Sequence, residues 1–290
     1  MPKVSKKKIQ WTWIISGVIA LIFFTLNLIA YASSRDADDS IIPGLGLQDA
    51  YILTIIIFLF PPTIVQTIDA RWRSKIDENL PNLLRDVSDA QKTGLTLPKA
   101  ISESSKRNYG PLTDELKKMS SKISWGVPFD KAMIAFAESC DTSLVKRAAL
   151  LILEAEKSGG LIEDIFDASY EHVNKILDLR RERLGQMKPY TWIIYASYFV
   201  FLIVAIVLLQ TFFQELGGAT TGEGGLIRNV DADKYEWAFL DMLMIEAIFA
   251  GLVAGKMGEG SLVRGLKHSV ILITTGWILF RILMGIELVG

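Results

Sequence analysis

Five apolar stretches, each long enough to cross a bilayer, constrain this chain more than any other feature of its sequence. They cover residues 11–31, 50–68, 190–213, 237–255 and 269–289. A run of roughly 20 apolar residues crosses the hydrocarbon core as one helix. Aromatic residues such as Trp11, Tyr190 and Trp237 stand near the ends of several stretches, as is typical at headgroup level. The sequence therefore predicts a polytopic membrane protein with five transmembrane helices.

The second stretch contains Pro61 and Pro62. Proline has no backbone N–H and its ring disturbs the preceding turn of a helix. In a membrane this is tolerated where neighbouring groups satisfy the freed backbone. We expect the pair to kink this span or to unwind its inner half.

The charges between the stretches alternate in sign and indicate an orientation. Lysines at positions 3, 6, 7 and 8 precede the first stretch, and the loops after the first and third stretches are acidic. The segment between the last two stretches is basic again. Lys and Arg concentrate on the cytoplasmic side of membrane proteins. We expect the N-terminus and residues 69–188 to be cytoplasmic, and both acidic loops and the C-terminus to lie outside.

The first stretch has a second interpretation as a cleaved signal peptide. A lysine-rich start, an apolar run and the small residues Ala30 and Ala32 fit that pattern. The run is longer than the usual signal core of ~7–15 residues, which favours a retained span. Cleavage would leave the orientation of the later spans unchanged.

Residues 69–188 form a polar segment between the second and third spans. Half of the whole chain is hydrophobic and 22% is charged, so the charge is segregated into this segment and the loops. Apolar residues recur at helical spacing, and the breaks fall at Gly94, Gly110-Pro111, Gly126-Val127-Pro128 and Gly159-Gly160. No strand pattern is visible. The predicted fold is all-α: a six-helix cytoplasmic bundle at 69–188, between an N-terminal pair of spans at 1–68 and three C-terminal spans at 189–290.

Two basic clusters border this segment, at residues 71–75 and 180–188. They have two interpretations. One is positive-inside topology with contact to membrane lipid headgroups. The other is docking of an acidic partner below the membrane.

The last two stretches form a predicted hairpin with a short basic cytoplasmic elbow at 256–268. Small residues Ala247, Gly251 and Gly255 recur every fourth position before the elbow. Small residues at this spacing allow membrane helices to approach closely. We interpret them as helix-packing residues.

Known catalytic and cofactor chemistry finds little support in the sequence. The single cysteine, Cys140, and the two histidines, His172 and His268, exclude a disulfide framework and a multi-ligand Cys/His zinc site. A net charge of −1 gives no basis for nucleic-acid binding. The segment Gly251–Met257 resembles a phosphate loop only superficially, because one residue is missing between the glycines and Met follows the lysine. We therefore predict no catalytic, cofactor-binding or metal site.

Glu246 and Arg281 are ionisable residues inside the fourth and fifth stretches. Counted from the apolar ends at ~1.5 Å per residue, both fall near mid-depth of the bilayer. An unpaired charge at that depth costs at least about 2.5–3.5 kcal/mol. We predict an intramembrane ion pair between them; the alternatives are a protonated Glu246 or separate partners for the two charges.

Three stretches of sequence carry a resemblance to a known family. Residues 80–88 (LPNLLRDVS), 157–165 (KSGGLIEDI) and the elbow residues 255–261 (GKMGEGS) resemble the type II secretion system F-domain family. The elbow is most similar to the membrane platform proteins of archaeal flagella (archaella) and archaeal type IV pili. The resemblance covers residues 76–290 and implies a non-enzymatic assembly platform in the cell membrane. It also implies two kinds of partner, a hexameric secretion ATPase and pilin or archaellin subunits.

The resemblance also suggests where partners bind. Basic residues just below the bilayer are the candidate contacts to the ATPase; they are Lys256, Arg264 and Lys267 in the elbow and Arg180, Arg181 and Arg183 near the third span. Many family members contain two helical domains and this chain has one, so we expect a homodimer or a heterodimer with a second platform protein. A membrane transporter or an intramembrane enzyme of unknown substrate is the alternative function, because Glu246, Arg281 and the Pro61-Pro62 break are compatible with either.

Overall fold

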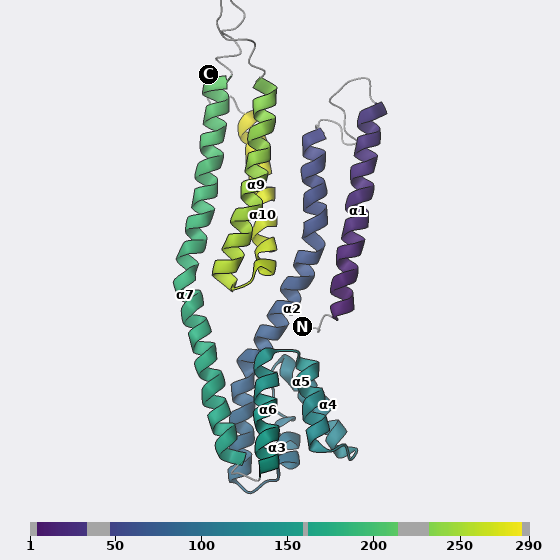
Figure 1. The fold of residues 1–290 in the computed structure, drawn as a ribbon, viewed down its shortest axis with the longest axis vertical. Helices are drawn as coiled ribbons and strands as arrows, with labels where there is room; N and C mark the ends of the chain where they lie inside the picture. Colours follow the sequence, from purple (N-terminus) through teal and green to yellow (C-terminus); the bar gives the residue numbers. More distant parts are fainter. Residues whose placement is uncertain (1–4, 34–46, 159–161, 214–231, 286–290) are drawn as a thin grey trace, which may run out of the picture. The chain divides into compact units, whose positions relative to one another are not determined.

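The computed structural model describes residues 5–33, 47–158, 162–213 and 232–285, and every regular element in these ranges is a helix. Five of the helices are long and apolar enough to cross a membrane. They are α1 (Lys6–Ser33), α2 (Leu47–Lys92), α7 (Ile162–Leu208), α9 (Ala232–Glu259) and α10 (Leu262–Gly285), labelled in Figure 1. The predicted all-α fold with five membrane-spanning helices is confirmed.

The chain divides into two compact units, and both boundaries fall inside helices. The bundle unit comprises Ile68–Arg183, and the span unit comprises Ser5–Thr67 and Leu184–Gly290. Helix α2 crosses the first boundary and α7 crosses the second, without a break at either point. Helix α2 continues through Pro61 and Pro62, so of the two predicted outcomes, a kink or an unwound inner half, the unwound inner half is excluded.

The described residues of the bundle unit form six helical segments, as the glycine and proline breaks predict. The lower part of α2 is followed by α3 (Leu97–Ser104), α4 (Pro111–Ser124), α5 (Phe129–Cys140), α6 (Ser143–Ser158) and the first part of α7. Gly94 ends α2 with a positive φ of 82°, which favours glycine. Pro111 begins α4, where its missing N–H has no helical partner to lose. The Thr142 hydroxyl accepts a hydrogen bond from the Val145 N–H (3.3 Å), so Thr142 caps α6.

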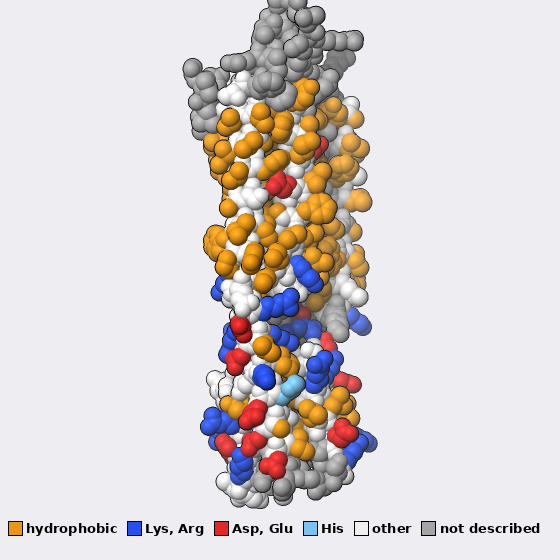
Figure 2. Space-filling model, turned by 60° about the vertical axis from the view of Figure 1, so that its left-hand side comes forward, with side chains coloured by type: hydrophobic (Ala, Val, Ile, Leu, Met, Phe, Trp, Pro, Cys, Tyr) orange, Lys and Arg blue, Asp and Glu red, His pale blue; other side chains and the backbone are white. Residues whose placement is uncertain are grey.

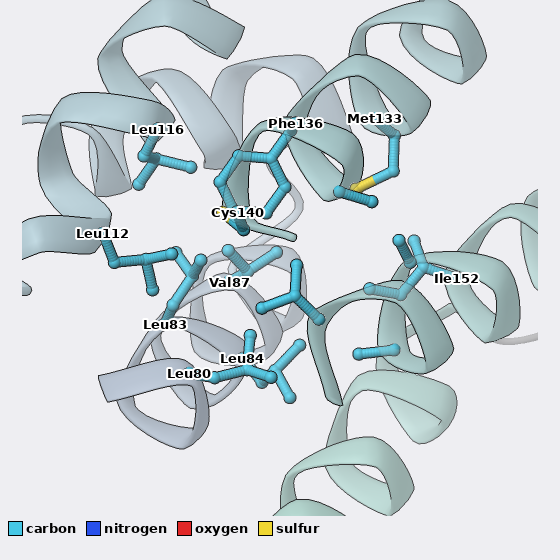
Figure 3. Close-up of a cluster of buried hydrophobic side chains, with 14 of the residues drawn as sticks. Leu80, Leu83, Leu84, Val87, Leu112, Leu116, Met133, Phe136, Cys140 and Ile152 are labelled. Carbon is cyan, nitrogen blue, oxygen red and sulfur yellow. The ribbon is translucent and has the colours of Figure 1, made fainter. Parts of the chain in front are cut away.

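The core of the bundle unit is built from one apolar stripe of α2 and the facing sides of the shorter helices. Leu80, Leu83, Leu84 and Val87 recur at helical spacing and are almost fully buried. Figure 3 shows these side chains meeting others from α4, α5 and α6; the labelled partners are Leu112, Leu116, Met133, Phe136, Cys140 and Ile152. Cys140 is completely buried among them, as expected for a small core residue.

Polar contacts fix α2 to the turn between α5 and α6. The Arg73 guanidinium donates to the Asp69 carboxylate (2.8 Å) and to the backbone carbonyl (2.6 Å) and carboxylate (3.1 Å) of Asp141. Asp141 adopts a left-handed backbone with φ of 50°. At the other end of α2, the Lys92 ammonium and the Ser88 hydroxyl donate to Asp167 of α7 and hold the pKa of that carboxyl below its usual range.

The span unit has its own buried cluster, formed mainly by α7, α9 and α10. Tyr198, Leu202, Ile206 and Leu209 form one stripe of α7 and its π-helical continuation (Leu209–Phe213), and all four are at most 3% exposed. Figure 2 shows hydrophobic side chains covering the visible face of the span helices, whereas charged side chains are scattered over the bundle helices. An apolar outer surface around a packed interior is the pattern of a membrane-embedded bundle.

Candidate functional site

The α9–α10 hairpin is a close helix pair in the span unit and is the candidate functional site. A Cβ added at Gly255 would lie 2.0 Å from the Cα of Gly265, and one added at Gly251 would lie 2.2 Å from the backbone nitrogen of Ser269. Backbone therefore meets backbone along this contact. The Ser269 hydroxyl donates across it to the Ile248 carbonyl (2.9 Å). Ala247, Gly251 and Gly255 all lie on this buried face, where the GxxxG spacing permits close approach.

The turn between the two helices is much shorter than the predicted elbow at 256–268. Helix α9 ends at Glu259 and α10 begins at Leu262, with Gly260 at a positive φ of 73° between them. Lys256, Arg264 and Lys267 consequently lie on helix ends rather than in a loop. The prediction counted polar residues as loop, but Lys and Arg are good helix formers and polar residues often occupy the last turns of a span.

One face of α7 packs on the hairpin through residues that the sequence analysis did not single out. Thr191, Tyr195 and Tyr198 recur at positions i, i+4 and i+7. A Cβ added at Gly258 would lie 2.7 Å from the Thr191 hydroxyl, and one at Gly276 would lie 1.8 Å from the Tyr198 hydroxyl. Tyr198 donates to the Leu272 carbonyl of α10 (3.1 Å). These hydroxyl-bearing residues recur at helical spacing and continue the spacing of the buried α7 stripe that begins at Tyr198. This spacing is the sequence signal that could have identified the face.

A polar cluster closes the turn end of this three-helix contact. The Tyr195 hydroxyl hydrogen-bonds to His268 Nδ1 (2.7 Å), and His268 Nε2 lies 3.3 Å from the Glu259 carboxylate. Lys267 forms an ion pair with the same carboxylate. The cluster joins the end of α9 and the start of α10 to α7, which continues from the bundle unit.

The structure separates the six predicted partner-binding cations into two groups. Lys267 is engaged by Glu259, Arg180 donates to Asp77 of α2 (3.0 Å), and Arg181 pairs with Asp178 (3.2 Å). Within the described ranges, Lys256, Arg183 and Arg264 are exposed and make no ion pair; of these, Lys256 and Arg264 flank the hairpin turn. These cations are available to a partner without breaking an internal contact.

Arg281 does not pair with Glu246, and the predicted intramembrane pair is corrected. Its guanidinium binds the carboxylate of Asp49 at the start of α2 through Nε (2.8 Å) and Nη2, and Nη1 lies 3.9 Å from Glu236 of α9. The Trp277 indole N–H donates to the same Asp49 carboxylate (2.6 Å). Asp49 is 1% exposed, although it directly precedes the predicted second stretch and thus falls in the acidic loop after the first stretch.

The register of the hairpin explains this correction. Gly251 faces Ser269 and Gly255 faces Gly265, so each step along α9 matches one step back along α10. When this register is continued to the open end of the hairpin, Phe239 rather than Glu246 lies opposite Arg281. Glu246 lies seven residues from that position, or about 10 Å along the helix axis. That separation is too large for a direct ion pair.

A metal site and a phosphate loop would each need a particular local geometry in the part of the chain that the structure describes. No group of three or more His, Cys, Asp or Glu side chains there is placed to hold a metal ion. The segment with the superficial likeness to a phosphate loop is helical throughout, as part of α9. The described site comprises the helix contacts, the polar cluster around His268 and the exposed cations.

These features define a class: a multi-pass membrane protein with a helical bundle inserted between its second and third spans. Residues 83–210 match the family model "Type II secretion system (T2SS), protein F". This part of the chain is thus similar to the domain of the type II secretion F family. The resemblance to the F-domain family inferred from the sequence is confirmed over these residues, and the elbow at 255–261 lies outside the match. The match begins in the bundle part of α2 and ends in the π-helical continuation of α7.

A comparison with curated proteins points to an archaeal relative. An uncharacterized protein of Methanocaldococcus jannaschii is 25% identical over 288 residues, which cover 98% of this chain and 46% of the relative. The chain thus spans about half the length of the relative it matches. No solved structure matches the chain.

Proposed function

We propose that this protein is the membrane platform of an archaeal type IV pilus or archaellum-like machine, or of a related type II secretion-like machine. In this role it anchors a cytoplasmic hexameric secretion ATPase and couples the motion of that ATPase to the insertion of pilin or archaellin subunits. The observation that carries the proposal is the F-domain match over residues 83–210. An archaeal relative that aligns with 98% of the chain supports the archaeal assignment.

The bundle unit is the part that we assign to the cytoplasm. The lysines at positions 3, 6, 7 and 8 and the cations around the α9–α10 turn support an inside location of these ends, and the acidic loops support an outside location of the opposite ends. In this arrangement the bundle unit and the hairpin turn face the same compartment as the ATPase. The C-terminus is then outside the cell membrane.

The exposed cations of the hairpin turn are the proposed ATPase contact. Lys256 and Arg264 make no ion pair among the described residues. A partner carboxylate would therefore bind them without breaking an ion pair within this chain. By contrast, Arg180 and Lys267 are already paired, and we assign them to the stability of the fold. Complementary charge of this kind affects mainly the association rate and the choice of partner.

Co-purification from the native membrane tests the function and the contact separately. The tagged full chain should retain the secretion ATPase, and Lys256→Glu/Arg264→Glu should reduce the bound amount at least about tenfold at low salt. The matched control, Lys256→Arg/Arg264→Lys, conserves both charges and should bind normally. Failure of the unaltered chain to retain the ATPase contradicts the platform function. Equal retention by all three chains contradicts only the assigned contact.

We also propose that the chain acts as a homodimer or together with a second platform protein. The relative is about twice as long as the segment it shares with this chain, so a second half of comparable size has a precedent in one polypeptide. The same purification reports the mass of the complex in mild detergent. A strict monomer, alone and with a co-expressed second platform protein, would contradict this stoichiometry.

A further inference from the structure

Two adjacent prolines leave two carbonyl oxygens of α2 without their helical donors. In an α-helix each N–H binds the carbonyl four residues earlier. Pro61 and Pro62 have no N–H, so the carbonyls of Ile57 and Phe58 lose their partners. These carbonyls lie in a membrane-spanning part of α2, where no bulk water replaces the lost bonds.

Ser16 of α1 supplies a hydroxyl at this point. Its Oγ lies 3.1 Å from the Ile57 carbonyl and 2.5 Å from the Phe58 carbonyl, which are the two that the prolines free. Ser16 is 1% exposed. A serine hydroxyl has a single proton to donate, so it binds one of the two carbonyls at a time.

Other hydroxyls on these helices behave differently. Thr25 donates to the Ile22 carbonyl (3.0 Å) and Thr54 to the Ala50 carbonyl (2.8 Å), each within its own helix. Such local bonds are the usual way for a helical Ser or Thr to satisfy its hydroxyl. Ser16 instead bonds across to α2.

Apolar contacts hold α1 at the same level of α2. The rings of Trp13 and Phe58 meet edge to face with centroids 5.5 Å apart. A Cβ added at Gly17 would lie 3.7 Å from the Phe58 ring, an ordinary van der Waals distance. Much of the rest of α1 is exposed, for example Leu21 at 65% and Ile29 at 63%. The Trp13–Gly17 segment therefore packs α1 against α2 beside the proline pair.

We propose that Ser16 and Pro61–Pro62 form a hinge clamp in which α1 sets the conformation of α2. The missing N–H groups weaken α2 at this point, and the Ser16 proton can pass from the Phe58 carbonyl to the Ile57 carbonyl as the helix bends. One freed carbonyl stays paired in either position. Because α2 continues without a break to Lys92, bending at the prolines changes the direction of the helix that carries the first core stripe of the bundle unit. This proposal does not depend on the identity of the machine.

Amide hydrogen exchange of the full chain in lipid nanodiscs tests the clamp. Ser16→Ala should speed exchange of the backbone amides at residues 63–67 about three- to tenfold, because an inter-helix hydrogen bond in a membrane is of modest strength. The same change in a Pro61→Ala/Pro62→Ala background should alter exchange less than twofold, since the restored N–H groups satisfy the carbonyls. Thr25→Val is the matched control and should change exchange in this segment in neither background.

The dependence on the prolines separates a clamp from ordinary packing. An equal effect of Ser16→Ala in both backgrounds, or no effect in the native one, would overturn the proposal. Should the double proline variant fail to insert, Pro62→Ala alone replaces it. That variant restores the donor to Phe58, so Ser16→Ala should then have a smaller effect than in the native chain. Ser16→Thr keeps a hydroxyl and should retain most of the protection.

Discussion

Replacement of Arg281 by glutamine tests the ion pair that joins α10 to the start of α2. The Asp49 carboxylate is buried and accepts hydrogen bonds from Arg281 Nε at 2.8 Å and from Trp277 Nε1 at 2.6 Å. Breaking a fully buried pair from one side costs about 3–5 kcal/mol, because the remaining charge stays desolvated. The Arg281 side chain is 40% exposed, so the pair is only partly buried. We therefore expect Arg281→Gln to lower the free energy of unfolding by about 2–3 kcal/mol.

A pair of double-mutant cycles identifies the partner of Arg281. Asp49→Asn with Arg281→Gln should be less harmful than the sum of the single changes by at least about 1 kcal/mol. Glu246→Gln with Arg281→Gln should be additive within about 0.5 kcal/mol, because the two side chains are seven residues out of register. Unfolding by SDS titration in mixed micelles measures all the variants under one condition. Coupling in the Glu246 cycle and none in the Asp49 cycle would refute the register derived for the hairpin.

Two further predictions concern the hairpin and the topology. Gly255→Ala should destabilise the protein by about 2–3 kcal/mol in the same titration, because the added methyl meets the backbone of α10 at 2.0 Å; Gly185→Ala has open space and should be neutral or stabilising by up to about 1 kcal/mol. Equal effects at both glycines would argue against the close contact. In a Cys140→Ala background, a cysteine at Ser40 should react with an impermeant thiol reagent on whole cells, and a cysteine at Ser121 should not. The opposite labelling pattern would reverse the proposed orientation.

The features that the sequence predicted well are local ones. Hydropathy over ~20 residues identified the five candidate spans among the described helices, because a membrane helix must be apolar along its own length. The breaks at Gly94 and Pro111 predicted helix ends in the bundle unit, because left-handed φ and a missing N–H act within one turn. The spacing of Gly251 and Gly255 likewise predicted a packing face. None of these inferences requires knowledge of a distant neighbour.

Contacts between helices were predicted poorly, and the proline pair shows why. A break at Pro61–Pro62 is visible in the sequence, but its consequence depends on which side chain lies opposite. Ser16 is 45 residues away in sequence and stands in an ordinary apolar stretch, so nothing local distinguishes it from Thr25. With a donor supplied by α1, the helix continues through the prolines rather than unwinding.

The wrong prediction of a Glu246–Arg281 ion pair also concerns a contact between helices. It can be traced to the predicted start of the fifth span. The predicted fifth span began at Ser269, whereas α10 begins at Leu262, seven residues earlier. At ~1.5 Å per residue this shifts the estimated position of Arg281 by about 10 Å along the helix. That shift equals the offset between Glu246 and the position that faces Arg281 across the hairpin. An ion pair requires its atoms to lie within about 4 Å. A shift of two turns at a helix end is therefore harmless for counting spans and decisive for pairing charges. The register of α9 and α10 removes Glu246 as the partner of Arg281, and the contacts of Arg281 show Asp49 of α2 in its place.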